Sequence, residues 1–392
     1  MSLRHIVIIG SSSAGIYAAE AARKQNPDVR ISVYSEDSHL PYYRQRLCEV
    51  IADRSARERL QLHPEAWYQE RRIDLNLKQK VTRIHEQQQE IELENGIRVS
   101  YDKLILATGS RSFMPNLPGK DLKGVFTIWT MDDALAVEEA LHKARHAVII
   151  GGGLLGLEAA YTCKQRGADT LLLERGERLL MKQLDKKSSE LFREQVTRLG
   201  VQVVCNAETA ALLPDEEDAD RLGAVKLTNG DSFPCDLLIV STGVRARLEL
   251  IDQTKIQAER CMVVNKRMET QAKNIYAAGD CVCLDGRWYG LWSISKLQGQ
   301  TAGCNAAGGD AVCEMPVPPY MVNTMETRIA SAGLAQMDDS EYTRQINVDE
   351  VQLTYDRRNY LGNDLVGFIL LGDTKPFSLL TKDLRESVHR LR

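Results

Sequence analysis

Two glycine-rich segments, each directly after a short apolar run, carry the residue types that bind phosphate groups. Glycine allows a tight turn and a close backbone approach, and a helix that begins there points free N–H groups at an anion. The segments are Gly10-Ser-Ser-Ser-Ala-Gly15 after His5–Ile9 and Gly151-Gly-Gly-Leu-Leu-Gly156 after Ala147–Ile150. Ser12 stands where the second glycine of the G-x-G-x-x-G pattern belongs. We predict two pyrophosphate sites, with candidate residues Gly10, Ser12, Ser13, Ala14 and Gly15 in the first and Gly151, Gly153, Leu154, Leu155 and Gly156 in the second.

An acidic residue follows each segment at the distance that such a unit requires. Glu36 lies 21 residues after Gly15, and Glu174 lies 18 residues after Gly156. A βαβ unit needs about 20 residues to bring a carboxylate to the ribose of a bound adenosine. A carboxylate also repels a 2′-phosphate, so Glu174 predicts NADH in preference to NADPH, with the nearby Arg175 and Arg178 opposing this preference.

A second repeated feature supports the first. Asn95-Gly96 is followed by an apolar strand ending in Ala107-Thr108-Gly109, and Asn229-Gly230 by a strand ending in Thr242-Gly243. Asn-Gly is a strong hairpin signal, and the offset from asparagine to the final glycine is 14 residues in both copies. The chain therefore contains two copies of one plan, a βαβ unit followed by a hairpin and a buried strand.

The elements that must position these residues can be predicted from the same segments. Helices are expected from Ala14 to about Lys24 and from Leu154 to about Arg166. Asn26-Pro27 and Gly167 then end them, as helix terminators commonly do. Each glycine-rich segment should thus connect a buried strand to a helix.

The composition is that of an ordinary globular protein, with 43% apolar and 27% charged residues among 392. The longest apolar runs are far too short to span a bilayer. The first residues lead straight into a strand without a signal-peptide pattern, so we expect a cytoplasmic protein. The net charge of −4 argues against nucleic acid as a partner.

The nine cysteines are scattered, which favours a reduced chain. Cys281 and Cys283 are two positions apart in an extended segment, so their side chains should point to opposite faces. That is poor geometry for a disulfide between them or for a shared metal. The seven histidines form no metal-spaced cluster, and no metal site is predicted.

Several further motifs point to a known family. They are Leu40-Pro-Tyr-Tyr-Arg-Gln-Arg-Leu47, the second glycine segment continued to Glu158, Gln183-Leu-Asp185, Asn274-Ile-Tyr-Ala-Ala-Gly-Asp280-Cys, Lys296-Leu-Gln-Gly-Gln-Thr-Ala-Gly303 and Gly367-Phe-Ile-Leu-Leu-Gly-Asp373. On these residues the chain resembles, nearly end to end, the FAD-dependent pyridine nucleotide-disulfide oxidoreductase superfamily. It is most similar to NADH:rubredoxin reductases and to the flavin-containing N-terminal part of NAD(P)H nitrite reductase large subunits.

The resemblance implies an α/β fold with two Rossmann-like dinucleotide-binding domains of the three-layer ββα type, one inserted in the other. A small α+β C-terminal domain would follow. The FAD-binding domain would comprise residues 1–112 and 245–315, the NAD(H)-binding domain residues 113–244, and the C-terminal interface domain residues 316–392. Pro316-Val-Pro-Pro319 has the composition of a linker before the last domain. A monomer and a homodimer both remain open.

The resemblance also implies roles for individual residues. Asp280, after Gly279, corresponds to the aspartate that binds the ribityl chain of FAD. Arg44 would stabilise negative charge on reduced flavin, and Glu158 would face the flavin and contact Arg44, so both are candidate catalytic residues. Trp292 is expected near the flavin ring. Val81, Ala107, Thr108 and Gly109 complete the predicted FAD site, and Gly243 completes the NAD(H) site.

The implied reaction is hydride transfer from C4 of NADH to N5 of the flavin, followed by electron transfer to a small carrier such as rubredoxin or ferredoxin. Disulfide reductases place a Cys-x4-Cys pair beside the flavin. Here Gln45 lies near that position and Cys48 comes one helical turn later, so we interpret Cys48 as structural. The alternatives are an NADH oxidase or peroxidase that uses oxygen species, and a non-catalytic redox-sensing flavoprotein.

Overall fold

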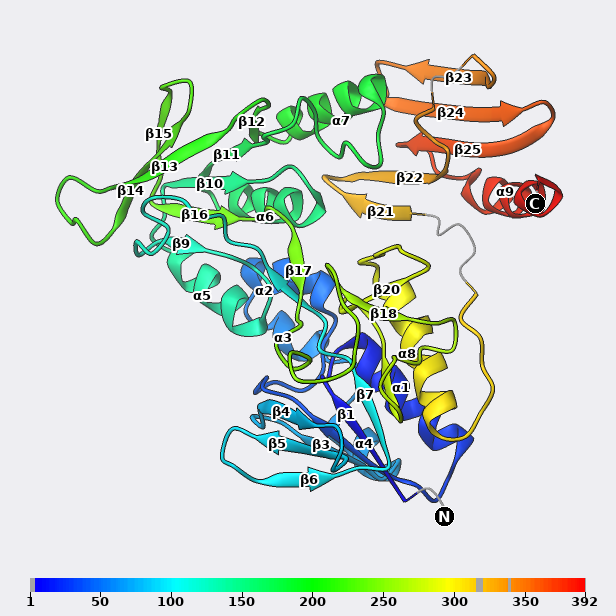
Figure 1. Cartoon of the computed structure of the whole chain (residues 1–392). Coiled ribbons are helices and arrows are strands. Elements are labelled where there is room, and N and C mark those ends of the chain that lie inside the picture. Colours follow the sequence, from blue (N-terminus) through cyan, green and yellow to red (C-terminus); the bar gives the residue numbers. More distant parts are fainter. Residues whose placement is uncertain (1–3, 315–319, 338–339, 392) are drawn as a thin grey trace.

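The computed structural model describes residues 4–314, 320–337 and 340–391 (Figure 1). Two five-stranded parallel sheets form its two larger parts. The first has the order β19-β7-β1-β2-β3, with β1 (His5–Ile9), β2 (Arg30–Tyr34), β3 (Ile73–Asn76), β7 (Lys103–Leu106) and β19 (Ile275–Ala277). The second has the order β12-β11-β10-β16-β9, with β9 (Val125–Phe126), β10 (His146–Ile150), β11 (Asp169–Leu173), β12 (Gln202–Val204) and β16 (Leu237–Val240).

The two sheets confirm the duplication predicted from the repeat. Strands β1, β2, β3 and β7 occupy the same places in the first sheet as β10, β11, β12 and β16 in the second. The fifth strand differs in origin, because β9 precedes the other strands of the second sheet in the chain, whereas β19 belongs to the first sheet but follows the whole second sheet. The second unit is therefore inserted into the first.

Each parallel sheet lies between helices and a small antiparallel sheet, which confirms the three-layer arrangement. Side chains alternate between faces along a strand. Ala147 and Ile149 of β10 accordingly join the core on the helix side, and Val148 and Ile150 join the core under the antiparallel strands. The antiparallel strands are β4 (Val81–His85), β5 (Glu90–Leu93) and β6 (Arg98–Ser100) in the first unit, and β13 (Thr209–Pro214), β14 (Leu222–Leu227) and β15 (Ser232–Pro234) in the second.

The helices begin and end close to where the sequence predicts. The helix after the first glycine segment is α1 (Ser13–Gln25), and the one after the second is α6 (Leu154–Gln165). The remaining helices are the 3₁₀ turn η1 (Arg44–Arg46), α2 (Leu47–Ala52), α3 (Ala56–Arg59), α4 (Glu65–Glu70), α5 (Met131–Leu141), α7 (Lys186–Arg198), α8 (Trp292–Ala306) and α9 (Phe377–Leu391). None of the described helices is both long and apolar enough to cross a membrane.

Helix α8 packs directly against α1, although the two are far apart in the chain (Figure 1). A Cβ atom on Gly299 would lie 2.2 Å from the carbonyl oxygen of Ala14, and one on Gly303 would lie 2.0 Å from that of Ala18. Only glycine permits so close an approach of two helix backbones. The hydroxyl of Ser13, in the first turn of α1, also donates to the carbonyl of Trp292, at the start of α8, at 3.4 Å.

A third, antiparallel sheet follows, with the order β21-β22-β25-β24-β23. One face carries α9, through a small core that includes Phe368, Leu380 and Leu384. Its other face joins the helix-side core of the second unit through Ile329 and Ile369. The predicted linker Pro316–Pro319 lies outside the described residues. The strands are β21 (Tyr320–Thr324), β22 (Thr327–Gly333), β23 (Thr343–Asp349), β24 (Thr354–Leu361) and β25 (Asp364–Leu371).

Two short ribbons complete the fold. Strands β8 (Ser110–Ser112) and β17 (Val244–Ala246) pair antiparallel where the chain leaves the first unit and where it returns. Strands β18 (Met262–Val264) and β20 (Val282–Leu284) pair in parallel.

The β18–β20 ribbon corrects one prediction about the cysteines. Cys261, directly before β18, forms a disulfide with Cys283 in β20, and their Cα atoms are 5.6 Å apart. The expectation of a reduced chain is therefore wrong for this pair, because the pairing of the two strands brings together residues 22 positions apart. Cys281 is not part of the bond, as expected, and lies buried against the carbonyl of Ala278.

Candidate functional site

A cavity of about 1160 Å³ lies at the carboxyl ends of the parallel strands of the first sheet. Ligands commonly bind at this edge of an open parallel sheet. From there the cavity reaches α2, the first turns of α6 and strand β21. The predicted first-site residues that line it are Gly10, Ser12, Ser13, Ala14, Glu36, Arg44, Val81, Ala107, Thr108, Gly109, Gly279, Asp280 and Trp292.

The cavity brings only part of the predicted second site together with the first. Leu154, Leu155 and Glu158 line it. Gly15 lies beneath it, where a Cβ atom would be 1.9 Å from the carbonyl oxygen of Gly10. The residues that do not line it are Gly151, Gly153, Gly156, Glu174 and Gly243.

The turn between β1 and α1 has the shape that a pyrophosphate needs. Gly10 has φ +109°, and a Cβ atom there would lie 2.1 Å from the carbonyl oxygen of Ala107. Ser12, the N-cap of α1, makes no side-chain capping bond. The first N–H groups of α1 therefore remain available for an anion at the positive end of the helix dipole.

Asp280 lines the cavity and is held in place by two serines. The hydroxyl of Ser110 donates to one carboxylate oxygen at 3.0 Å, and that of Ser295, on the first turn of α8, donates to the other at 3.1 Å. Burial raises the pKa of the Asp280 carboxyl, and these hydroxyls partly offset the effect. The sequence predicted Asp280 but neither serine, because both lie more than ten residues away from it in the chain.

The contact predicted between Arg44 and Glu158 is wrong. Among the described residues, which include both, no ion pair joins them. Arg44 donates to the carbonyl of Trp129, and its guanidinium carbon lies 5.3 Å from the ring centre of Tyr42 and 5.4 Å from that of Trp129. The carbonyl and the two rings hold the guanidinium beside Trp129.

Glu158 lies half-buried on α6. Burial raises the pKa of its carboxyl, and the negative charge of Glu49 acts in the same direction. Arg46, which is next to the predicted motif residue Gln45, binds Glu49 with two hydrogen bonds of 2.6 and 2.8 Å. Arg44 and Glu158 therefore both line the cavity, but Arg44 contacts Tyr42 and Trp129 whereas Glu158 is influenced by the charge of Glu49.

Cys48 is buried on α2, and burial raises the pKa of its thiol. A reactive cysteine needs the thiolate form, which a low pKa favours. Among the described residues it is also the only cysteine that lines the cavity. These surroundings support the interpretation of Cys48 as structural.

The second glycine turn repeats the geometry of the first. Gly151 has φ +114°, and a Cβ atom there would lie 2.2 Å from the carbonyl oxygen of Ser241. The Glu174 carboxylate accepts the N–H groups of Gly152 and Gly176, each at 2.6 Å. The acid at the end of β11 is thus fixed beside the turn by main-chain donors.

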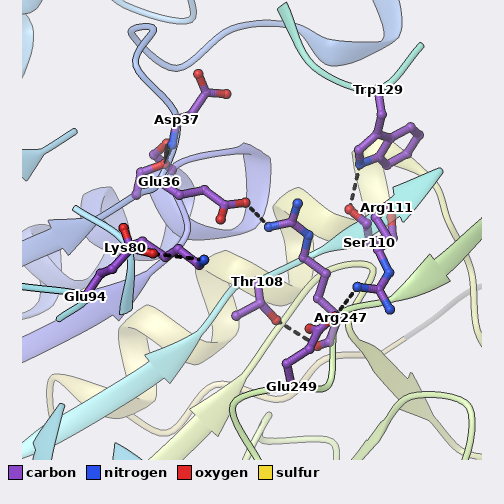
Figure 2. A network of polar contacts seen from close by, with 12 residues as sticks. Glu36, Asp37, Lys80, Glu94, Thr108, Ser110, Arg111, Trp129, Arg247 and Glu249 are labelled. Carbon is purple, nitrogen blue, oxygen red and sulfur yellow. Dashed lines mark hydrogen bonds and ion pairs between the residues drawn. The ribbon is translucent and has the colours of Figure 1, made fainter. Parts of the chain in front are cut away.

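Charged residues line the end of the cavity near Glu36 (Figure 2). Arg247 forms an ion pair with Glu36, and Arg111 forms one with Glu249. The indole N–H of Trp129 donates to the carbonyl of Ser110 at 2.6 Å. Sequence reasoning missed Arg247 and Trp129, since no local pattern marks either of them.

The chain matches the description "Pyridine nucleotide-disulphide oxidoreductase" over residues 4–301. The NADH-rubredoxin oxidoreductase of Clostridium acetobutylicum is 30% identical over 333 residues, which are 85% of this chain and 82% of that protein. The crystal structure of NADH:rubredoxin oxidoreductase from Clostridium acetobutylicum is similar with a TM-score of 0.81 at 28% identity, covering 100% of this chain and 96% of that one.

A further relative is the assimilatory nitrate reductase electron transfer subunit of Bacillus subtilis (strain 168), which is 28% identical over 382 residues. The match covers 96% of this chain but 48% of that protein, so this chain spans about half the length of the relative. The duplicated three-layer fold, the glycine turns and the family match over most of the chain agree with one another. The chain belongs to the pyridine nucleotide-disulphide oxidoreductase family.

Proposed function

We propose that this protein is a FAD-dependent NADH oxidoreductase that passes electrons to a small redox protein. One observation carries the proposal: a single cavity runs from Glu36, at the end of β2, to Glu158, on the first turns of α6. A ligand in this cavity would touch both dinucleotide units. That arrangement suits a cofactor bound by the first unit and reduced by a nucleotide bound to the second.

The residues present fit FAD in the first unit. The Gly10 turn and the start of α1 would hold its pyrophosphate, Glu36 would accept from the adenosine ribose, and Asp280 would accept from the ribityl hydroxyls. In the proposed division, residues 1–112 and 245–315 bind FAD, residues 113–244 bind NADH, and residues 316–392 form the interface domain. Glu174 supports NADH, because its carboxylate would repel a 2′-phosphate.

When bound, FAD would supply the redox chemistry, which is acceptance of hydride from NADH and transfer of electrons onward. Arg44 contributes a fixed positive charge on the Trp129 side of the cavity, which favours negative charge nearby. Helix α8 adds the positive end of its dipole at Trp292. Leu154 and Leu155 of α6 line the cavity and contribute apolar side chains to it.

A direct electron transfer to a carrier protein such as rubredoxin or ferredoxin fits the cavity better than dithiol chemistry. The relative from Clostridium acetobutylicum is named for rubredoxin. Cys48 is buried with a raised thiol pKa, so it is a poor participant in thiol–disulfide exchange.

Anaerobic stopped-flow spectroscopy tests the proposal. NADH should bleach the flavin absorbance of the FAD-loaded protein within seconds, and oxidised rubredoxin or ferredoxin should restore it. If NADH leaves the flavin oxidised, the reductase function is wrong. If oxygen reoxidises the flavin faster than either iron protein does, the protein is an NADH oxidase instead.

A further inference from the structure

We propose that Arg247 is a positioning residue of the FAD site, which holds the Glu36 carboxylate in place for the adenosine ribose. This inference rests on the proposed function, because it assumes that FAD binds in the first unit. Both side chains line the cavity, and they form an ion pair there (Figure 2). Arg247 lies 211 residues after Glu36 in the chain.

The backbone of Arg247 is hydrogen-bonded to Thr108 and Gly109, which line the cavity. Its N–H donates to the carbonyl of Gly109 at 3.0 Å, and its carbonyl accepts the hydroxyl of Thr108 at 3.2 Å. Thr108 and Gly109 directly precede β8, which pairs with β17. The main chain of Arg247 is therefore fixed where the chain returns from the second unit, and this limits the positions that its guanidinium can reach.

The two units orient their equivalent acids by different means. In the second unit, Glu174 is held by main-chain N–H groups from Gly152 and Gly176. In the first unit, the Glu36 carboxylate accepts a hydrogen bond from the guanidinium of Arg247. Arg247 thus supplies to Glu36 the orientation that the backbone supplies to Glu174.

The physical advantage is preorganisation. The side chains of Arg247 and Glu36 are 32% and 43% exposed, so without a partner the glutamate would sample several rotamers in water. A carboxylate offers about four acceptor positions, so the ion pair leaves room for the ribose hydroxyls. Fixing the carboxylate before FAD arrives lowers the ordering cost of binding.

Titration of FAD into the FAD-free protein, followed by quenching of flavin fluorescence, tests the proposal. Arg247→Ala should weaken FAD binding roughly three- to tenfold, in line with a partly exposed ion pair and one ordered side chain. Arg247→Lys should recover part of the affinity. Arg245→Ala is the matched control, because that guanidinium stacks over Phe113 at 4.3 Å outside the cavity and its loss should leave the Kd unchanged.

FMN separates positioning from a general structural effect, because it lacks the adenosine. Arg247→Ala should leave the affinity for FMN unchanged while it weakens that for FAD. A double-mutant cycle gives a second measure: in a Glu36→Gln background, Arg247→Ala should change the FAD Kd much less than it does in the wild type.

Three results would overturn the proposal: wild-type FAD affinity in Arg247→Ala, an equal loss for FMN, or additive effects in the cycle. If the wild-type protein fails to bind FAD at all, the proposed function itself is wrong. Full FAD binding with no effect at Arg247 rejects only the positioning role.

Discussion

At the scale of single residues, the buried carboxylate of Asp280 lowers the stability of the fold but supplies an acceptor for the proposed FAD site. Its carboxyl is held by Ser110 and Ser295, and burial raises its pKa. The two hydroxyls and the positive charge of Arg44 offset only part of the cost of burying this carboxylate, so its ionised form disfavours the folded state. Such groups are typical of sites that exchange stability for ligand binding.

Replacing Asp280 with asparagine should therefore have opposite effects on binding and on stability. The affinity for FAD should fall at least about tenfold, because the variant loses a charged acceptor. Near neutral pH the FAD-free variant should unfold at a higher temperature than the wild type, since the amide needs no charge in the protein interior.

The pH dependence of this difference follows from the direction of the pKa shift. Because the folded pKa of Asp280 is raised, its stabilising contribution is complete below the ordinary aspartate pKa and is lost as the pH rises through the folded value. The difference in thermal midpoint between Asp280→Asn and the wild type should therefore increase as the pH rises. A gap that is constant with pH would contradict this explanation.

Glu174 should decide which nicotinamide nucleotide is preferred. Glu174→Gln removes the charge that repels a 2′-phosphate, so the ratio of kcat/KM for NADH to that for NADPH should fall about tenfold. Glu190→Gln, at an exposed position of α7, is the charge-matched control and should leave the ratio unchanged. An unchanged ratio in Glu174→Gln would remove Glu174 from the specificity of the site.

At the scale of elements, a buried polar cluster joins α7 to the C-terminal sheet. Asp185 is the N-cap of α7 and accepts the N–H of Ser188 at 2.9 Å. Its other oxygen accepts from Tyr355 at 2.7 Å and from Arg357 at 2.8 Å, both in β24. Burial tends to raise the pKa of Asp185, but these hydrogen bonds outweigh it and hold the pKa below its ordinary value.

Arg357→Met should lower the free energy of unfolding by about 3 to 5 kcal/mol, because it leaves the buried Asp185 charge without its cation. The two side chains are only 4% and 11% exposed. Arg358→Met, which breaks a more exposed pair with Asp356, should cost less than about 1 kcal/mol. Urea denaturation of the FAD-free variants measures both values.

Acid should reduce the effect of the Arg357 substitution. Because the folded pKa of Asp185 is depressed, its contribution is present above the ordinary aspartate pKa and is lost as the pH falls through the folded value. The difference between Arg357→Met and the wild type should therefore shrink below about pH 4. A difference that grows in acid would show that the ion pair is not its source.

At the scale of the whole molecule, one core joins helix α2 of the first unit to the second unit and to the C-terminal sheet. It contains Val50 and Ile51 of α2, Ile149 and Leu157 of the second unit, and Ile369 of the C-terminal sheet. Domains that move independently usually have a hydrophobic core of their own, whereas this core is shared between parts. The shared core predicts that the parts unfold together.

Ile51→Ala tests this expectation, because the side chain is fully buried in the shared core. It should lower the free energy of unfolding by about 2 to 5 kcal/mol and keep a single transition. All four tryptophans lie between residues 67 and 292, so their fluorescence reports on regions outside the C-terminal sheet. Coincident fluorescence and far-UV circular dichroism curves are expected, and two separate transitions would contradict the prediction.

The features that sequence reasoning predicted correctly are local. The starts of α1 and α6, their ends, and both Asn-Gly hairpins depend on residues within a few positions of one another. Gly10 and Gly151 were identifiable because their positive φ angles require glycine in the turn itself. The repeated offset then predicted two matching units, which the strand orders confirm.

The sequence by itself determined the two dinucleotide units, since each depends on short-range spacing. Only the tertiary structure decided which side chains meet: Ser110 and Ser295 at Asp280, and Arg247 at Glu36. It also separated Arg44 from Glu158 and joined Cys261 to Cys283. These outcomes depend on the packing of α8 on α1 and on the pairing of β8 with β17 and β18 with β20, which bring together residues that no local pattern connects.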